Sequence, residues 1–201
     1  KVVGGPPPAR LMAARGLAPL SPPDLLTALY QLSHEADAKI AEAAAATFGK
    51  LPETVLASAL AQPLDPRVLD FAGRELFGRD PLMEVVLRNA ATTDETFFTI
   101  AAVVNESLAE LMAANEQRLL RHPAIIEALY FNKSTRMSTA DRIVELAVRN
   151  GVVLDRIPVY KELAAAIRGQ QGSAPPGAPT YDTEFHAAFE GATDVPLIFS
   201  V

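Results

Sequence analysis

The chain of 201 residues contains no cysteine and no tryptophan, and its three histidines stand far apart in the sequence, at His34, His122 and His186. The lack of cysteine excludes disulfides, thiolate zinc sites, iron–sulfur clusters and a cysteine nucleophile. None of the histidines has a second ligand-type residue at the spacing of a metal site. We therefore expect no metal site and no cofactor.

Motifs of the common enzyme classes are also missing. The sequence has no Gly-x-x-x-x-Gly-Lys-Ser/Thr phosphate loop, no Gly-x-Ser-x-Gly and no His-Glu-x-x-His. Neighbouring carboxylates occur at Asp94 and Glu95, but their position at a helix start accounts for them. We predict that the protein has no catalytic residues and is not an enzyme.

Long hydrophobic runs are absent as well. No apolar run approaches the roughly 18 residues of a membrane-spanning helix, and residues 1–20 lack the apolar stretch of a secretory signal. We expect no membrane span, and the lack of cysteine fits a cytoplasmic protein. The first residue, Lys1, is compatible with a fragment of a longer protein.

With 49% hydrophobic and 21% charged residues, the composition predicts a folded domain with a sizeable core.

The residues that are abundant favour helices. Alanine and leucine are frequent, and no sustained period-two alternation of apolar residues occurs. Cap-type residues recur, for example at Ser21, Asp65, Asp80, Ser107 and Ser138. The helix starts are expected near Pro52, Pro66, Pro81, Asp94, Ser107, Pro123 and Ser138. These intervals of 13 to 16 residues predict short helices, two of which form a hairpin of about 28–30 residues.

Two segments resemble each other. Pro81–Asn89 and Pro123–Asn132 both begin with proline and continue with a glutamate in an apolar run. Both end in asparagine, which we expect just past a helix end in the left-handed conformation. With this pattern, residues 50–150 resemble the degenerate helical repeats of the HEAT-like and leucine-rich-variant class. The resemblance implies a curved stack of helices that binds other macromolecules, and it implies no catalytic residue.

The predicted fold is all-α, an α-solenoid of short antiparallel helix pairs with a C-terminal linker and peptide. We divide the chain into an irregular arm (1–20), a helical repeat domain (21–168), a linker rich in glycine, proline and serine (169–180) and an acidic-aromatic tail (181–201). Gly73 is expected to be a point of close helix packing. The predicted core residues are Leu25, Leu29, Leu56, Leu60, Leu69, Leu76, Val86, Phe98, Leu111, Leu119, Ile126, Leu129, Ile143 and Leu146.

Charge is unevenly distributed along the chain. Residues 34–116 carry six basic and fourteen acidic side chains, whereas residues 117–161 carry eight basic and four acidic ones. Stacked repeats would bring the second group together into a partner-binding face, for which the candidates are Arg118, Arg121, His122, Lys133, Arg136 and Arg142. The alternative is an ordinary solvated face, in which Arg118 and Arg121 pair with Glu110 or Glu116 and His122 caps the helix at Pro123.

The tail combines acidic and aromatic residues, as many docking segments do. Its candidate docking residues are Tyr181, Phe185, Phe189, Leu197 and Phe199. One hypothesis is that the tail docks on the basic repeats, either within one chain or between two copies in a homo-oligomer. The other is that it begins a further domain.

Together these features favour a non-enzymatic scaffold or adaptor that binds a protein partner, of unspecified identity, through a groove of the solenoid. The alternative is an autoinhibited regulatory domain whose groove holds the tail until a partner displaces it. Binding of nucleic acid through residues 117–161 is a third hypothesis. The net charge of −6 and the lack of tryptophan argue against it.

Overall fold

The structure is a computed structural model, and it describes residues 3–158 and 160–171. All of its regular elements are helices, and the described residues form no strand, which confirms the all-α class. The helices are α1 (Pro7–Ala14), α2 (Pro22–Ser33), α3 (Ala38–Lys50), α4 (Glu53–Leu60), α5 (Pro66–Glu75), α6 (Asp80–Arg88), α7 (Asp94–Ala101), α8 (Glu106–Ala113), α9 (Glu116–Arg121), α10 (Ala124–Phe131), α11 (Met137–Arg149) and α12 (Tyr160–Gln171).

The helix starts follow the spacing of the sequence. Each of the seven predicted starts lies within one residue of the first residue of α4, α5, α6, α7, α8, α10 or α11. The six-residue helix α9 lies inside the longest predicted interval and was not expected as a separate element.

The predicted caps are only partly correct. Ser21 and Asp65 accept hydrogen bonds from the first turns of α2 and α5, as predicted. The cap of α8 is Asn105 rather than Ser107, because Asn105 is the last residue before the helix and accepts from the N–H of Leu108. No side-chain cap precedes α6 or α11, so the caps predicted at Asp80 and Ser138 are wrong.

Contacts divide the chain into two units, residues 1–158 and 159–201. The boundary falls inside the predicted repeat domain, and α12 belongs to the second unit. This helix continues to Gln171, past the start of the predicted linker at Gly169. In the first unit, α1 packs against α2 and α3, so the predicted irregular arm contains a packed helix in which Ala13 and Ala14 are fully buried.

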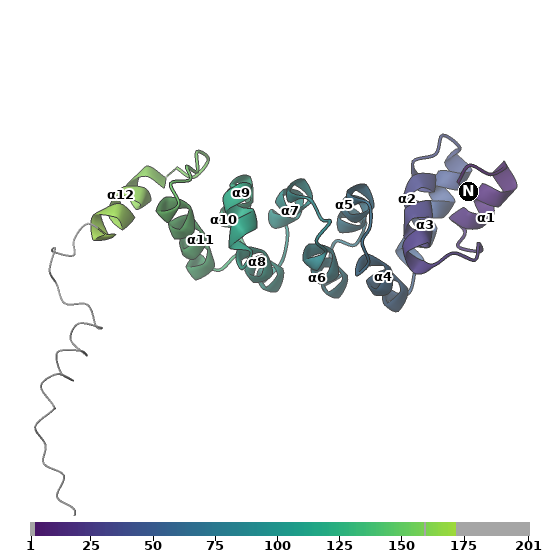
Figure 1. Cartoon of the computed structure of the whole chain (residues 1–201), viewed down its shortest axis with the longest axis horizontal. Helices are drawn as coiled ribbons and strands as arrows, with labels where there is room; N and C mark the ends of the chain where they lie inside the picture. Colours follow the sequence, from purple (N-terminus) through teal and green to yellow (C-terminus); the bar gives the residue numbers. More distant parts are fainter. Residues whose placement is uncertain (1–2, 159, 172–201) are drawn as a thin grey trace, which may run out of the picture. The chain divides into compact units, whose positions relative to one another are not determined.

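Within the first unit the helices after α3 form two rows (Figure 1). One row is linked by contacts of α4 with α6 and of α6 with α8, and the other by contacts of α5 with α7 and of α7 with α10. The rows contact each other where α5 meets α6 and α7 meets α8. Helices that are two or three places apart in the chain therefore become neighbours in a row.

The core lies between these helices. Ten of the fourteen predicted core residues are buried. The four that are only half-buried are Leu25, Phe98, Leu111 and Leu146. In each case an adjacent residue is buried instead, namely Leu26, Phe97, Met112 and Ala147. A one-residue shift turns the buried face of a helix by about 100°, which short helices with many apolar residues do not fix by sequence pattern alone.

Two asparagines tie neighbouring helices of a row together. The Nδ2 of Asn132, after α10, donates to the carbonyl oxygens of Ala101 and Val104 at the end of α7, both at 2.9 Å. In the same way, the Nδ2 of Asn89, after α6, donates to the carbonyl oxygens of Leu60 and Gln62 at the end of α4. Both asparagines end a helix, as expected.

The expected left-handed conformation of these asparagines is wrong. Their φ angles are −70° for Asn89 and −74° for Asn132, in the extended region. The extended backbone lets each side chain reach the neighbouring helix, and it lets each Oδ1 accept from the N–H two residues further on, that of Ala91 or of Ser134. The internal similarity of the sequence therefore marks a shared tie between helices.

Candidate functional site

Arg118 and Arg121, both predicted to bind a partner, lie on α9 and converge on Asp94, the first residue of α7. The Nη1 of Arg118 lies 2.7 Å from the Oδ1 of Asp94. Arg121 binds the same carboxylate twice, through Nε at 2.7 Å and through Nη2 at 2.6 Å. The solvated-face alternative is thus right that the arginines are paired, but the partner is Asp94 and not Glu110 or Glu116.

Within this cluster Arg118 is largely buried, whereas the side chain of Arg121 is 62% exposed. The side chain of Arg118 is only 11% exposed, its Cζ lies 3.9 Å from the centroid of the Phe97 ring, and its Nη1 also donates to the carbonyl oxygen of Thr92. The hydrogen bond from Arg121 lowers the pKa of Asp94, and the same bond raises the pKa of Arg121. Burial lowers the pKa of Arg118, against the opposing attraction of Asp94. The carboxylate of Asp94 therefore compensates the charges of both guanidinium groups within the protein.

The remaining predicted residues of this face have other neighbours than Asp94. Arg136 forms an ion pair with Glu106, and Arg142 lies 3.5 Å from Glu110. Lys133 is exposed and has no ion-pair partner among the described residues. His122 ends α9, and its ring centroid lies 6.2 Å from that of Phe98.

Four of the six predicted partner-binding residues are thus neutralised by acidic side chains of preceding helices. Such ties between helices characteristically join residues 24 to 32 positions apart, as in Arg118–Asp94 and Arg142–Glu110. The acidic partners of these four arginines therefore belong to residues 34–116, the segment whose charge was counted separately. A charge sum along the chain cannot detect this compensation.

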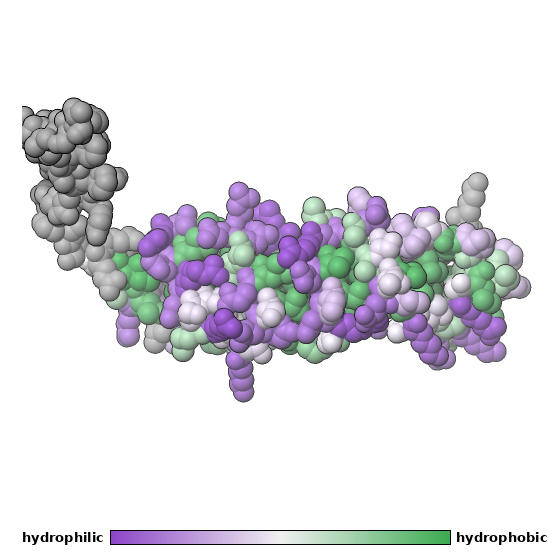
Figure 2. Space-filling view, turned by 90° about the horizontal axis from the view of Figure 1, so that it is seen from below, coloured by the Kyte–Doolittle hydropathy of each residue, from purple (hydrophilic) through white to green (hydrophobic). Residues whose placement is uncertain are grey.

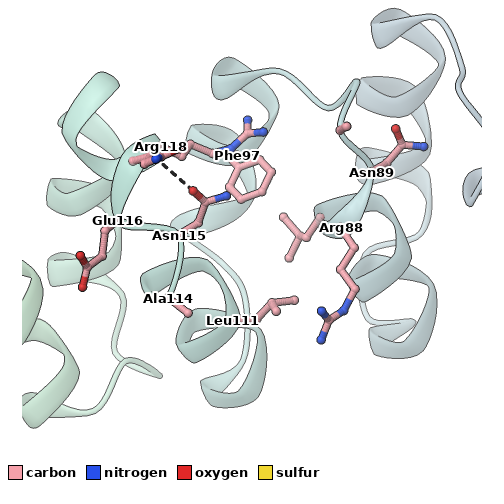
Figure 3. A pocket seen from close by; sticks show the side chains of 11 residues that line it. Arg88, Asn89, Phe97, Leu111, Ala114, Asn115, Glu116 and Arg118 are labelled. Carbon is pink, nitrogen blue, oxygen red and sulfur yellow. Dashed lines mark hydrogen bonds between the residues drawn. The ribbon is translucent and has the colours of Figure 1, made fainter.

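One hollow, with a volume of about 630 Å³, lies among α6, α7, α8 and α9. Figure 3 shows Arg88 and Asn89 across it from Asn115 and Arg118. Several of its polar groups have partners: Asn115 accepts from the backbone N–H of Arg118 at 3.2 Å, Asn89 holds the end of α4, and Arg88 pairs with Glu84. The Nε of Arg118, which also lines this hollow, is buried and has no hydrogen-bond partner among the described residues.

A second surface is apolar and runs along α5 and α7. A hollow of about 320 Å³ is lined by Gly73, Phe77, Ile100 and Val103, with Asp70, Arg74, Thr96 and Thr99 at its polar side. The side chains of Phe77 and Val103 are 59% and 53% exposed. Both also line a smaller hollow of about 210 Å³ toward α6 and α8.

This surface continues at its other end. Asp70, Arg74 and Thr99 also line a hollow of about 520 Å³ with the aromatic residues Tyr30, His34 and Phe71. Adjoining hollows share lining residues, so the three lie next to one another. We call this series of hollows the α5–α7 groove, extending from Tyr30 through Arg74 to Phe77 and Val103.

Exposed apolar residues recur along the row that contains the groove. Phe77, Val103 and Phe131 lie at or just after the ends of α5, α7 and α10, at intervals of 26 and 28 residues, and Phe131 is 50% exposed. Figure 2 shows, for one face, that apolar surface (green) lies exposed between hydrophilic side chains (purple). Large exposed apolar patches are typical of interaction surfaces.

Phe77 and Val103 were not predicted from the sequence as functional residues. The sequence contained one signal that could have identified them: each is an apolar residue just after a helix, where the core pattern of the helix does not require one. Phe77 lies in the turn between α5 and α6, directly before Gly78, which has a φ of +84°.

The described residues contain no group of three or more histidine, aspartate or glutamate side chains placed to hold a metal ion. Among them, no helix has the length and apolar character that crossing a membrane requires. The predicted docking residues of the tail, Tyr181 to Phe199, lie outside the described residues. Comparison with known protein families, with curated proteins and with solved structures found no match to this chain.

Proposed function

We propose that this protein is a non-enzymatic scaffold or adaptor that binds a segment of a partner protein in the α5–α7 groove. The observation that carries the proposal is the exposure of Phe77 and Val103, which line the same hollows. Burying apolar surface contributes about 25 cal/mol per Å², so a partner that covers these side chains gains affinity directly. Such central apolar residues dominate the affinity of protein interfaces.

The proposal includes an α-solenoid of HEAT-like repeats as the framework. Its support is the packing of helices in two rows and the separation of 24 to 32 residues between tied side chains. That separation is close to the 28–30 residues of the predicted hairpin. In a repeat stack each unit contacts mainly its neighbours, so equivalent residues of successive repeats form an extended binding surface.

Binding of nucleic acid is less well supported. Affinity for nucleic acid depends on lysines and arginines that neutralise phosphates, and four of the six basic-face candidates already pair with carboxylates. Nucleic-acid binding would weaken steeply as salt rises, whereas apolar binding in the groove would change little.

The proposal is tested with the full chain and two matched valine variants. Val103→Glu places a charge in the groove, and Val153→Glu places the same charge at a valine that is 61% exposed outside it. Each protein is used to isolate partners from a nuclease-treated lysate of source cells, and bound proteins are quantified by mass spectrometry. We expect one specific partner with the wild type and Val153→Glu, reduced at least tenfold with Val103→Glu. Equal capture by all three proteins would overturn the proposal.

A further inference from the structure

We propose that the α5–α7 groove binds a segment of another protein that is basic at both ends and apolar in the middle. This inference rests on the proposed function, because it names the chemistry of the segment that the groove holds. Two carboxylates without an ion-pair partner among the described residues line the two outer hollows, and an apolar hollow lies between them.

The two arginines that line the groove are already paired. The Nε of Arg74 lies 3.0 Å from the Oδ2 of Asp70, one turn earlier in α5. Arg67 binds both side-chain oxygens of Asp65, the residue before α5, at 2.9 and 3.0 Å. Each arginine therefore compensates one carboxylate next to it and leaves the other carboxylates of the groove without a counter-charge.

Two further carboxylates line the groove. Glu95, in the first turn of α7, lines the hollow at the aromatic end and is exposed to solvent. Asp80, the first residue of α6, lines the hollow at the opposite end, and it accepts a hydrogen bond from the neutral Nδ2 of Asn105 at 2.5 Å. Neither carboxylate forms an ion pair with a described residue. The groove therefore carries an uncompensated negative charge at each end.

The hollow between the two ends is mainly apolar. Phe77, Ile100 and Val103 line it, and its two charged residues, Asp70 and Arg74, bind each other. A charged ligand group placed here would lose hydration without finding an unpaired opposite charge. An apolar side chain would instead cover the exposed parts of Phe77 and Val103. The middle of the groove is therefore complementary to an apolar residue.

The aromatic end gives a second reason for a basic side chain. Tyr30 and Phe71 line the same hollow as Glu95, and the centroids of their rings lie 5.6 Å apart. The face of an aromatic ring attracts an ammonium or guanidinium group, and a carboxylate in the same hollow adds to this attraction. A lysine or arginine of the partner would therefore meet both kinds of group, whereas an acidic side chain would be repelled by Glu95.

The order of these features follows from α7. Glu95, Thr99 and Val103 recur at intervals of four residues, which places them on one side of the helix and the turn that follows it, about 6 Å apart along the axis. Glu95 lines the aromatic hollow, Thr99 lines that hollow and the central one, and Val103 lines the central hollow and the last. A complementary segment therefore reads basic, apolar, basic along its length.

Charge argues against an occupant from the chain itself. Residues 172–201 contain four acidic side chains and no lysine or arginine, and the whole chain has a net charge of −6. Like charges at both ends of the groove disfavour such a tail, and they disfavour a second copy in the same way. Charge complementarity therefore favours a basic segment of another protein.

The test uses the full chain and a labelled, end-blocked peptide, Gly-Lys-Ala-Leu-Phe-Leu-Ala-Lys-Gly, whose lysines flank an apolar centre. Comparison peptides carry glutamine or glutamate in place of both lysines, or three serines in place of Leu-Phe-Leu. Binding to the wild type, to the groove variant Glu95→Gln/Asp80→Asn and to the control variant Glu42→Gln/Asp141→Asn is measured by fluorescence anisotropy.

The control variant matches the groove variant in charge. Glu42 and Asp141 are exposed, line none of the three hollows and form no ion pair with a described residue. Both variants lose the same two negative charges in total. A difference between them therefore reports the position of the carboxylates and not the net charge of the protein.

We expect the lysine peptide to bind the wild type and the control variant equally and the groove variant about fivefold more weakly, because each exposed ion pair contributes a small factor. The glutamine and serine peptides should bind the wild type more weakly than the lysine peptide, and the glutamate peptide most weakly of the charge series. Equal binding of the lysine peptide to the two variants, tighter binding of any comparison peptide, or no saturable binding would overturn the inference.

A peptide of residues 181–201 tests the tail as a competing occupant. We expect it to leave the lysine peptide bound, and displacement at a lower concentration than unlabelled lysine peptide requires would overturn the assignment to another protein. If the lysine peptide fails while Val103→Glu still loses partner capture, the proposed function stands and the charge pattern is wrong. Undiminished partner capture by Val103→Glu would instead refute the proposed function, so the two failures are distinguishable.

Discussion

Asp94 illustrates how much one carboxylate organises in this fold. It opens α7, where a negative charge interacts favourably with the helix dipole, and it binds two arginines of α9. The buried guanidinium of Arg118 has no other carboxylate partner among the described residues. Removing the charge of Asp94 would therefore leave a largely buried cation without its counter-charge.

We predict that Asp94→Asn lowers the free energy of unfolding by about 2 kcal/mol at pH 7, measured by urea denaturation. Because the folded-state pKa of Asp94 is lowered, its stabilising effect is present above its ordinary pKa of about 4 and is lost as the pH falls below that value. The difference between wild type and variant should therefore be constant from pH 7 to about 5 and shrink below about pH 4. A difference that stays constant at low pH would contradict this account.

The asparagine ties give a second prediction for single residues. Asn132 is buried, and its replacement by alanine would leave the carbonyls of Ala101 and Val104 without this donor. We expect Asn132→Ala to cost about 2–3 kcal/mol of unfolding free energy and Asn89→Ala, at a half-buried site, about half as much.

The matched control for both is Asn150→Ala, because the exposed Asn150 donates only to the carbonyl of Leu146 in its own helix. We expect it to change the free energy of unfolding by less than about 0.5 kcal/mol. Equal effects of Asn132→Ala and Asn150→Ala in urea denaturation would show that the ties between helices do not stabilise the fold.

At the scale of elements, short helices are held more by their neighbours than by their own sequence. Helices of eight to ten residues are marginal alone, so packing has to supply most of their stability. In the contact between α5 and α7, Gly73 lies against the side chain of Ile100. Substitution of this glycine tests how closely the two helices pack.

We predict different effects on the free energy of unfolding when alanine replaces two helical glycines. Gly49, in α3, has nothing within 4 Å of an added Cβ, so Gly49→Ala should raise the free energy of unfolding by about 0.5–1 kcal/mol through helix propensity. Gly73→Ala should fail to give this gain, because its Cβ would meet Ile100, and Ile100→Val should restore part of it. An equal gain for both glycines in urea denaturation would contradict close packing of α5 against α7.

For the whole molecule, local sequence signals predicted the positions of helices, but they did not predict which residues of different helices pair. Prolines and cap-type residues act within one turn, and they placed the starts of seven helices within one residue. The pairing of Asp94 with Arg118 and Arg121 depends instead on which helices become neighbours, so no local pattern reveals it. The basic face was predicted from a sum over residues 117–161, and most of its candidates proved to be paired with acidic residues outside that segment.

The candidate groove was hidden from the sequence for the same reason. Phe77 and Val103 lie 26 positions apart, and each alone is an ordinary apolar residue near a helix end. Only the packing of α5 beside α7 brings them to one hollow and leaves both exposed. The function proposed for the molecule therefore rests on an arrangement that emerges from helix packing.

The most direct measurement of that function is site-specific photo-cross-linking of the full chain in its source cells. A photoreactive phenylalanine analogue is placed at Val103, in the groove, or at Val153, outside it, and the cross-linked peptides are identified by mass spectrometry. The account predicts that position 103 cross-links to one segment of a partner protein and that position 153 does not. Identical cross-link patterns from the two positions, or none from position 103, would contradict it.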